Sequence, residues 1–470
     1  MALSPLGHVL LAFFGRGQRG LTTPVTDTAY ARVNSALYGY FLLLLVWAPL
    51  PLASNRDWST TLLACLLLGG LLWALVLLWS GQLRITPALR RAWPALAALA
   101  AAQLWVLLQL VFGISVAPDA TRMALLLGCA LVAAFILVLL LVDSRERVLF
   151  TTRVMVWCGV FQAFFAAAVM MSEIEQIALL DKTFVRDIAT GTFINRNHLA
   201  GFLEMNLAIG VGMLVAQLHR HPAANWREFM RRTIDTILSR KFRLRLYLAI
   251  MVIGLVLTRS RMGNSAFFTS LLLCGMLGLV LQQRVTRSAV IFFVSLLVID
   301  LYIVGNWFGV DEVVQRLQNT SLAGEKRDEV AIDSFVMWKD HFWAGTGADT
   351  FFQAYVDGGY MSPDSLYYRH AHNDYLEIGT GFGFIGFSLL GTVVLTSLWQ
   401  AIQAQRRRHS RVLQGLGFAS MMGVVSILIH SFADFNLHIT ANSLWFTVLL
   451  AFAWVANGVP NGVGKRPKST

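Results

Sequence analysis

The sequence contains about twelve apolar runs, each long enough to cross a lipid bilayer as a helix of roughly 20 residues. They lie near residues 34–53, 60–80, 93–112, 122–142, 151–171, 198–218, 243–258, 264–283, 288–306, 373–400, 412–433 and 441–457. Of the 470 residues, 56% are hydrophobic and only 14% are charged, which excludes an ordinary soluble domain. The sequence therefore predicts an all-α polytopic membrane protein, with a single transmembrane domain over residues 1–470.

The distribution of charge predicts how these spans are oriented. Short cytoplasmic loops are enriched in Lys and Arg. With the N-terminus inside, the inward segments hold most of the 38 Lys and Arg, whereas most of the 26 Asp and Glu lie elsewhere. We therefore expect both termini in the cytoplasm. The net charge of +12 follows from the same rule, so it requires no nucleic-acid partner.

The outward segment at residues 307–372, between the ninth and tenth spans, is longer than a connector needs to be. Patterned stretches at Val313–Leu317 and Glu329–His341 indicate short amphipathic helices, and a turn-rich stretch follows at residues 344–349. We expect this segment to form a partly helical cap over the membrane domain.

Several arginines remain in the outward segments, where few are expected. They are Arg186, Arg196, Arg259, Arg261, Arg327 and Arg369. A guanidinium near the membrane surface can bind a phosphate group through two parallel hydrogen bonds, although each arginine could instead pair with a loop carboxylate. Arg259 and Arg261 interrupt an apolar hairpin that contains no acid, so they favour a functional interpretation.

Two histidines precede the tenth span, in the stretch Tyr368-Arg369-His370-Ala371-His372-Asn373-Asp374. A neutral histidine can accept a proton from a sugar hydroxyl. The alternatives are interfacial histidines bonded to loop carbonyls, or a metal site. The H-x-H-x-D pattern is short and common among residues that bind no metal, and the four cysteines lie inside apolar runs. We therefore expect no metal and no other cofactor.

Two further sets of polar residues lie near outer helix ends. Asn197 and Glu204 are about two helical turns apart in the sixth span and would share a face. Glu204 could orient an arginine or hold two helices together. His430 and Asp434 are four residues apart at the end of the eleventh span, where structural capping is the favoured interpretation.

Taken in order along the chain, these residues resemble the motifs of the O-antigen ligase and polymerase superfamily. The stretch 191–200, with Arg186 upstream, is similar to the family's Gly-Thr-Phe and Asn-x-Asn-x-Leu-Ala motif. Residues 260–263 resemble its Ser-Arg-Gly region, with Met262 intervening. His372-Asn373 and the glycine nine residues later fit the ligases' His-Asn-x9-Gly pattern, and residues 430–438 are similar to a late outward segment.

This resemblance implies a fold of the polyprenyl-phosphate glycosyltransferase type and metal-independent transfer, with the active site facing the periplasm at the bacterial inner membrane. His372 would be the catalytic base. Arg186 and Arg261 would bind the pyrophosphate of an undecaprenyl-pyrophosphate-linked glycan donor, with Arg259 as a second phosphate ligand. In ligases the acceptor is the lipid A–core. The supporting residues would be Arg196, Asn197, Glu204, His370, Asn373, Asp374 and Arg369.

Three other functions remain open at this point. An O-antigen or exopolysaccharide polymerase would extend a growing glycan on the same carrier. A protein O-oligosaccharyltransferase would use a protein side chain as acceptor. A transporter could also have twelve spans, but transporters usually place ionisable groups near the membrane midplane, whereas here they gather at one face. In every case membrane lipids surround the protein.

Overall fold

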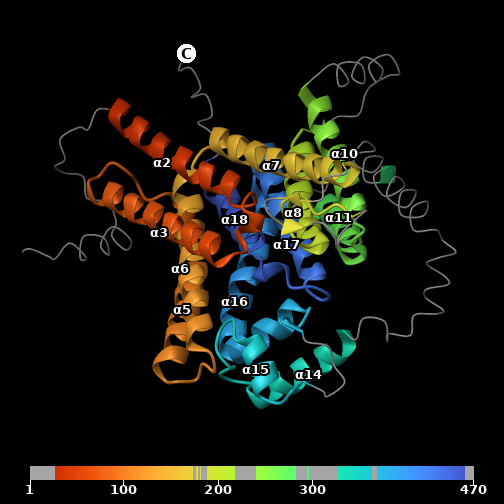
Figure 1. Cartoon of the computed structure of the whole chain (residues 1–470). Coiled ribbons are helices and arrows are strands. Elements are labelled where there is room, and N and C mark those ends of the chain that lie inside the picture. Colours follow the sequence, from red (N-terminus) through yellow and green to blue (C-terminus); the bar gives the residue numbers. More distant parts are fainter. Residues whose placement is uncertain are drawn as a thin grey trace, which may run out of the picture.

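The structure is a computed structural model that describes residues 27–172, 176–177, 180–181, 188–217, 240–281, 294–295, 327–361 and 368–460. These residues form helices, apart from a short antiparallel hairpin of β1 (Gln176–Ile177) and β2 (Leu180–Asp181). Figure 1 shows a bundle of long helices with a group of shorter elements below it. The described part of the chain therefore has the all-α architecture that the sequence predicts.

Nine described helices are long and apolar enough to cross a membrane. They are α3 (Asp57–Trp79), α5 (Trp93–Val111), α6 (Pro118–Leu141), α7 (Arg145–Met171), α8 (Arg196–Val215), α11 (Arg261–Leu281), α16 (Asp374–Arg407), α17 (Arg411–His430) and α18 (Thr440–Gly458). Two more predicted spans coincide with α2 (Asp27–Trp47), whose apolar part is shorter, and with α10 (Arg240–Leu257). The span predicted at 288–306 lies almost entirely outside the described residues, so the total of twelve stays a prediction.

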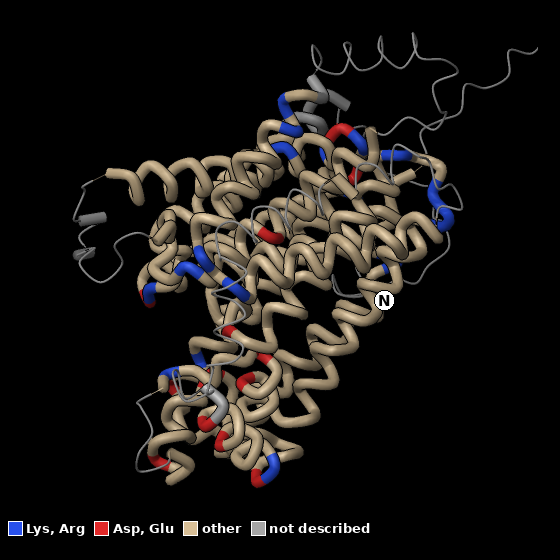
Figure 2. The backbone as a smooth tube through the Cα atoms, turned by 90° about the vertical axis from the view of Figure 1, so that its right-hand side faces the viewer, with Lys and Arg blue, Asp and Glu red and all other residues tan. Residues whose placement is uncertain are grey.

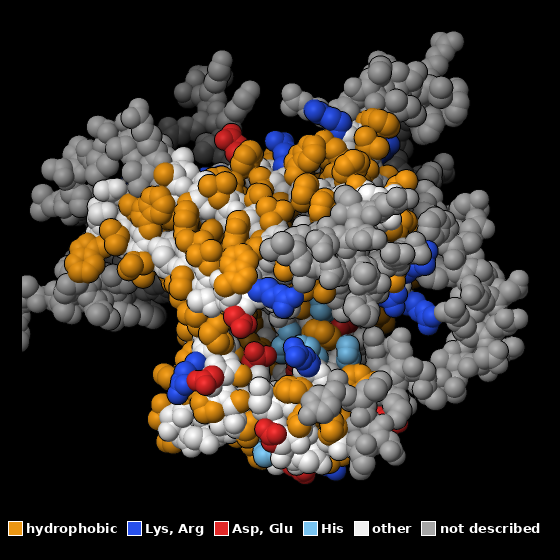
Figure 3. Space-filling model, viewed as in Figure 1, with side chains coloured by type: hydrophobic (Ala, Val, Ile, Leu, Met, Phe, Trp, Pro, Cys, Tyr) orange, Lys and Arg blue, Asp and Glu red, His pale blue; other side chains and the backbone are white. Residues whose placement is uncertain are grey.

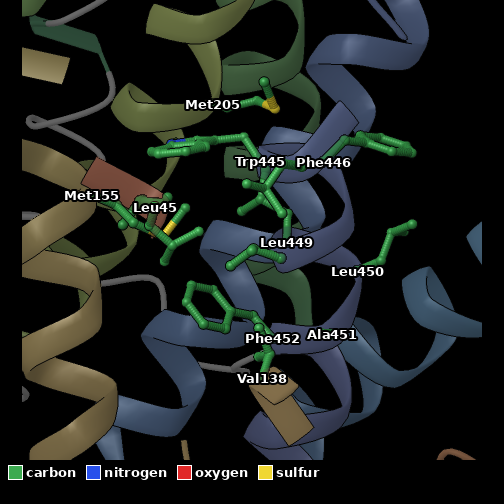
Figure 4. Close-up of a cluster of buried hydrophobic side chains, with 14 of the residues drawn as sticks. Leu45, Val138, Met155, Met205, Trp445, Phe446, Leu449, Leu450, Ala451 and Phe452 are labelled. Atoms are coloured by element: carbon green, nitrogen blue, oxygen red, sulfur yellow. The ribbon is translucent and has the colours of Figure 1, made fainter. Parts of the chain in front are cut away.

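Helices α8, α17 and α18 form the centre of the bundle. In α18, 94% of the most apolar window is buried, against 28% in α5. Figure 4 shows Trp445, Leu449 and Phe452 of α18 in one buried cluster with side chains from other helices. Because lipid offers apolar side chains as good an environment as the bundle does, close packing and polar contacts hold such helices together. Trp445 donates a hydrogen bond from Nε1 to Oδ1 of Asn206 in α8, at 3.1 Å.

Long apolar side chains are exposed on the outer helices. They include Leu72 and Trp79 of α3, Val111 of α5, and Leu395 and Trp399 of α16. Figure 3 shows hydrophobic side chains over much of the upper body of the molecule. An exposed apolar surface of this extent is expected where lipid covers the protein.

The cap consists of α14 (Arg327–Asp340), α15 (Phe351–Asp357) and the turns between α14 and α16. It has a small hydrophobic core of its own, which includes Met337, Phe351, Tyr355 and Ala371. The α14 bounds agree closely with the amphipathic stretch predicted at Glu329–His341, whereas the stretch at Val313–Leu317 lies outside the described residues.

A break in α16 attaches the cap to the bundle. Gly383 has φ +65° and ψ −179°, a conformation that only glycine adopts readily. The amides after the break donate to the cap, as in the 2.7 Å bond from Phe384 N to Phe342 O, and the carbonyls before it accept, as in the 2.8 Å bond from Thr346 N to Thr380 O. From α5, Gln109 Nε2 donates to Gly381 O at 2.9 Å. The backbone groups freed by the break are thus paired with the cap.

The two ends of the bundle differ in charge. Figure 2 shows most Lys and Arg toward the upper end of the view and most Asp and Glu toward the lower end, in and around the cap. We refer to these as the basic end and the cap end. The C-terminal ends of α3, α6, α16 and α18 lie at the basic end, and the N-terminal ends of α8, α11, α16 and α18 lie at the cap end.

Candidate active site

The loop that carries His372 is fixed at the start of α16. Asn373 is the N-cap residue, and its Oδ1 accepts hydrogen bonds from the amides of Tyr375 at 3.0 Å and Leu376 at 3.1 Å. Its Nδ2 donates to Phe432 O at 3.1 Å, in the turn after α17. Asp374 is buried and bonds to the same turn, because its Oδ2 accepts from Ser431 Oγ at 2.7 Å. The two outer turns therefore form one rigid unit.

His372 lies beside a buried carboxylate. Its side chain is 21% exposed, and its Nδ1 is 3.9 Å from Oδ1 of Asp434, which is fully buried. The same Oδ1 lies 3.7 Å from Nε2 of His198, at the start of α8. His372 has φ +50°, an unusual value for a residue other than glycine. Strain of this kind persists only where the surrounding structure holds it in place, and it is common at functional sites.

The charge of Asp434 is favoured by its neighbours. Burial alone would raise the pKa of this carboxyl. The nearby imidazole of His198, the charge of His430 and the hydrogen bond from the amide of Phe435 outweigh burial, so the pKa of Asp434 is held well below its usual range. Asp434 is therefore a carboxylate at neutral pH and can stabilise a protonated histidine next to it.

A second group of ionisable residues surrounds Glu377 of α16. His370 Nδ1 lies 2.6 Å from Oε1 of Glu377, and the amide of Ala371 donates to Oε2 at 3.1 Å. On the other side, His438 Nε2 lies 3.6 Å from Oε1 of Glu377, and His438 Nδ1 lies 3.7 Å from Oδ1 of Asp349 in the cap. Burial would lower the pKa of His438, but the nearby carboxylates of Glu377, Asp349 and Asp374 raise it to about 10. His438 is therefore a cation at neutral pH.

The ring of Phe435 holds the histidines of both groups together. It stacks on His370 with 4.0 Å between ring centroids, and it meets His372 edge-on at 5.1 Å. His198 lies edge-on to the same ring at 4.7 Å. Figure 3 shows histidine side chains at the surface between the bundle and the cap. The three imidazole rings are thus oriented by one apolar side chain.

Glu204 joins two central helices next to this site, further into the bundle. Its Oε1 lies 2.7 Å from Nδ1 of His430 in α17, and its Oε2 accepts from Ser426 Oγ at 2.7 Å. All three side chains are inaccessible to solvent. Glu204 therefore connects α8 to α17 through these contacts, which are the kind expected if it holds helices together. His430 thereby has a carboxylate partner, in place of the capping role that its sequence position favours.

Two of the candidate arginines begin helices at the cap end. Arg196 is half-buried at the first position of α8, and Arg261 is exposed at the first position of α11. Arg259 is exposed in the turn between α10 and α11, with φ +51°. A Cβ built on Gly263 would lie 3.1 Å from Oε1 of Glu204, so the start of α11 packs directly against the polar centre of the bundle.

The three remaining candidate residues lie in different parts of the chain. Arg369 is exposed, one residue before His370. Asn197 is half-buried in the first turn of α8, where its amide donates to Oδ1 of Asn195 at 2.8 Å. Arg186 lies outside the described residues.

His370, Glu377 and His438 could together hold a metal ion. Each offers one ligand atom, and these atoms lie within 4.8 Å of one another. Two imidazoles and a carboxylate are a ligand set that suits Zn²⁺. The group differs from the H-x-H-x-D pattern seen in the sequence, because His438 replaces His372 and Glu377 replaces Asp374. A bound ion would compete with the 2.6 Å contact between His370 and Glu377.

The structure adds residues that the sequence analysis does not single out for the site. These are His198, Glu377, Asp434 and His438, together with Asp349 of the cap. Their sequence separations are long, 62 residues between His372 and Asp434, so no local pattern connects them. His198, Asp434 and His438 lie in stretches that resemble the family's motifs, at residues 191–200 and 430–438, but nothing in those stretches assigns them to the site of His372.

Residues 246–391 match the protein-family model described as O-antigen ligase. The matched segment runs from within α10 to the first half of α16 and contains both Arg261 and His372. No curated protein matches the chain. Together with the helical membrane architecture, this match over residues 246–391 supports the resemblance of the chain to the O-antigen ligase superfamily of glycosyltransferase-like membrane enzymes.

Proposed function

We propose that this protein transfers a glycan from undecaprenyl pyrophosphate to a hydroxyl group of the lipid A–core, on the periplasmic face of the bacterial inner membrane. The observation that carries the proposal is the position of His372, 3.9 Å from the buried carboxylate of Asp434 and within the segment that matches the family. The scarcity of Lys and Arg at the cap end supports a periplasmic location for this site, with both termini in the cytoplasm.

His372 acts as the general base. The acceptor hydroxyl oxygen forms a bond to the anomeric carbon of the donor, the bond from that carbon to the pyrophosphate oxygen breaks, and the hydroxyl proton moves to His372. Asp434 lies on the Nδ1 side of the ring, so it favours the tautomer with its proton on Nδ1 and leaves Nε2 to accept. Its negative charge then stabilises the imidazolium that forms.

Arg186, Arg259 and Arg261 bind the pyrophosphate of the donor. Negative charge develops on this group as it leaves, and fixed cations lower the energy of that transition state. The positive ends of two helix dipoles add to the effect, because α8 and α11 both begin at the cap end. Arg196 and Arg261 are the first residues of these helices, whose first turns are in contact, since a Cβ built on Gly263 would lie 2.6 Å from Cβ of Ala200. Arg369, one residue before His370, adds positive charge near the base.

Reconstitution tests the choice of acceptor. The purified protein is supplied with an undecaprenyl-pyrophosphate-linked glycan and, in separate reactions, with lipid A–core or with a second carrier-linked glycan. We expect transfer to the core. Lengthening of the carrier-linked glycan without a core product would contradict the ligase proposal and identify a polymerase, which needs the same donor site.

The same assay tests metal independence. We expect full transfer after exhaustive chelation, because the base and the arginines supply the proton transfer and the charge stabilisation. Loss of transfer that is restored by Zn²⁺ would contradict this expectation. It would indicate that His370, Glu377 and His438 hold a metal during the reaction.

A further inference from the structure

Three arginines from different helices meet at the basic end, far along the bundle from His372. Arg91 ends α4 (Pro87–Arg91), Arg145 begins α7, and Arg408 is the C-cap residue of α16. Burial, followed by the charges of Arg91 and Arg145, lowers the pKa of the Arg408 guanidinium. Cations are therefore crowded around Arg408.

The C-terminus of α18 brings Arg91 and Arg408 together. Arg91 donates from Nη1 to the carbonyl of Asn457, and Arg408 donates from Nη2 to the carbonyl of Val459. A Cβ built on Gly458 would lie 2.4 Å from Cα of Ala88, so only glycine permits this approach of α18 to α4. Asn457 Nδ2 also donates to Gln400 O of α16 at 2.7 Å. The site is thus built by three helix ends rather than by loose surface side chains.

The positive charge here exceeds what the described residues neutralise. Within the part of the chain that the structure describes, Arg91, Arg145 and Arg408 form no ion pair with a carboxylate. The carbonyl end of a helix carries roughly half a negative charge, which offsets only a fraction of three cations. The Nε atoms of Arg145 and Arg408 are buried and have no hydrogen-bond partner among the described residues. An anion with several acceptor oxygens would neutralise the excess positive charge and accept hydrogen bonds from the unpaired Nε atoms.

The surroundings indicate a lipid rather than a dissolved anion. Exposed aromatic side chains lie near the arginines in the sequence: Trp93 begins α5 just after Arg91, Phe150 follows Arg145 in α7, and Trp399 precedes Arg408 in α16. Tryptophan at helix ends marks the headgroup level of a bilayer. Basic pockets between spans at this level suit the phosphate of an anionic lipid.

We propose that Arg91, Arg145 and Arg408 form a binding site for the headgroup phosphate of an anionic phospholipid, at the opposite end of the bundle from the transfer site. The bound phosphate accepts hydrogen bonds from the three arginines and offsets their positive charge. It thereby stabilises the packing of α4, α7, α16 and α18. The proposal is independent of the transfer reaction.

Thermal unfolding in nanodiscs tests it. The full-length protein is compared in phosphatidylcholine alone and in phosphatidylcholine with phosphatidylglycerol. We expect phosphatidylglycerol to raise the Tm of the wild type by several degrees, since a ligand that binds only the folded state stabilises it. Arg145→Gln should lose at least half of this shift. It is the informative variant because Arg145 donates no hydrogen bond to α18, so its loss leaves the helix cap intact.

Arg407→Gln is the matched control, because Arg407 is an exposed arginine at the same end with no part in the cluster. It should keep the wild-type shift. An unchanged lipid response in Arg145→Gln would overturn the proposal, and so would an equal loss in both variants. If inorganic phosphate in phosphatidylcholine nanodiscs gave the same rise in Tm, the site would bind a free anion and the lipid assignment would be wrong.

Discussion

The cap end and the basic end both contain clusters of ionisable side chains, but the charges of these side chains are neutralised in different ways. At the cap end, Glu204, Glu377 and Asp434 are buried, and each has a histidine within ion-pair distance. At the basic end, Arg91, Arg145 and Arg408 have helix carbonyls and one another as neighbours, without a carboxylate among the described residues.

The cap end is therefore a preorganised site whose charges are paired within the protein. The basic end is a charged surface whose positive charge a ligand can neutralise. Buried charges are costly unless they are paired, so the pairs at the cap end fix the geometry of the loops that carry them. Charges at a membrane surface keep access to water and headgroups, and they tolerate incomplete pairing. The comparison therefore predicts that neutralising one charge is damaging at the cap end and mild at the basic end.

The largest effect is expected for Glu204→Gln. It removes the charge partner of His430 from a site with no solvent access, and breaking a buried pair in this way costs about 3–5 kcal/mol. Arg145→Gln, measured in zwitterionic lipid, should change stability by less than about 0.5 kcal/mol. Both values come from denaturant or thermal unfolding of the purified protein. Equal losses of stability in the two variants would contradict the proposed difference between the cap end and the basic end.

A backbone change at the cap end should be nearly as damaging. Gly383→Ala places a Cβ 2.4 Å from the carbonyl oxygen of Trp343, in a conformation that disfavours alanine, so we expect a loss of about 2–3 kcal/mol. Gly391→Ala, on the same helix, has no atom within 4 Å of the new Cβ and should be neutral or slightly stabilising. Differential scanning fluorimetry checks both. A stable Gly383→Ala protein would mean that the break in α16 is unnecessary for attaching the cap.

The positions of the described helices along the chain were largely predictable from the sequence. Each apolar run is a local pattern that can be recognised without knowing how the helices pack. The same holds for the start of α16, since Asn373 has the residue type of an N-cap and Asp374 follows in the first turn. The partner of His372 was not predictable. Asp434 follows α17 and does accept a bond from the next amide, as a capping residue does. Its contact with His372 depends on how α16 and α17 pack, which no local pattern encodes.

A smaller effect is expected for Arg261→Lys. The charge remains, but the paired hydrogen bonds to phosphate are lost, so turnover should fall by about tenfold. Arg243→Lys, an exposed position in the first turn of α10, is the matched control and should turn over at the wild-type rate. The measurement is the rate of glycan transfer at saturating donor. Similar rates for both variants would argue against phosphate binding by Arg261.

A further prediction concerns the pH dependence of stability. The pKa of His438 is raised to about 10 from an ordinary value of 6.5, so its protonation stabilises the folded protein fully below pH 6.5 and loses this effect as the pH rises toward 10. The Tm difference between wild type and His438→Asn should therefore shrink steadily between pH 6.5 and pH 10. His341→Asn, in the exposed turn after α14, supplies the baseline. A constant difference across this range would show that His438 is not held as a cation.

The most direct test of the central claim measures glycan transfer by His372→Ala in reconstituted membranes, beside His341→Ala as the matched histidine control. The base contributes roughly 10²- to 10⁴-fold to the rate. We predict a loss of this size for His372→Ala with an unchanged Tm, and a wild-type rate for His341→Ala. Transfer by His372→Ala at the wild-type rate would contradict the assignment of His372 as the base.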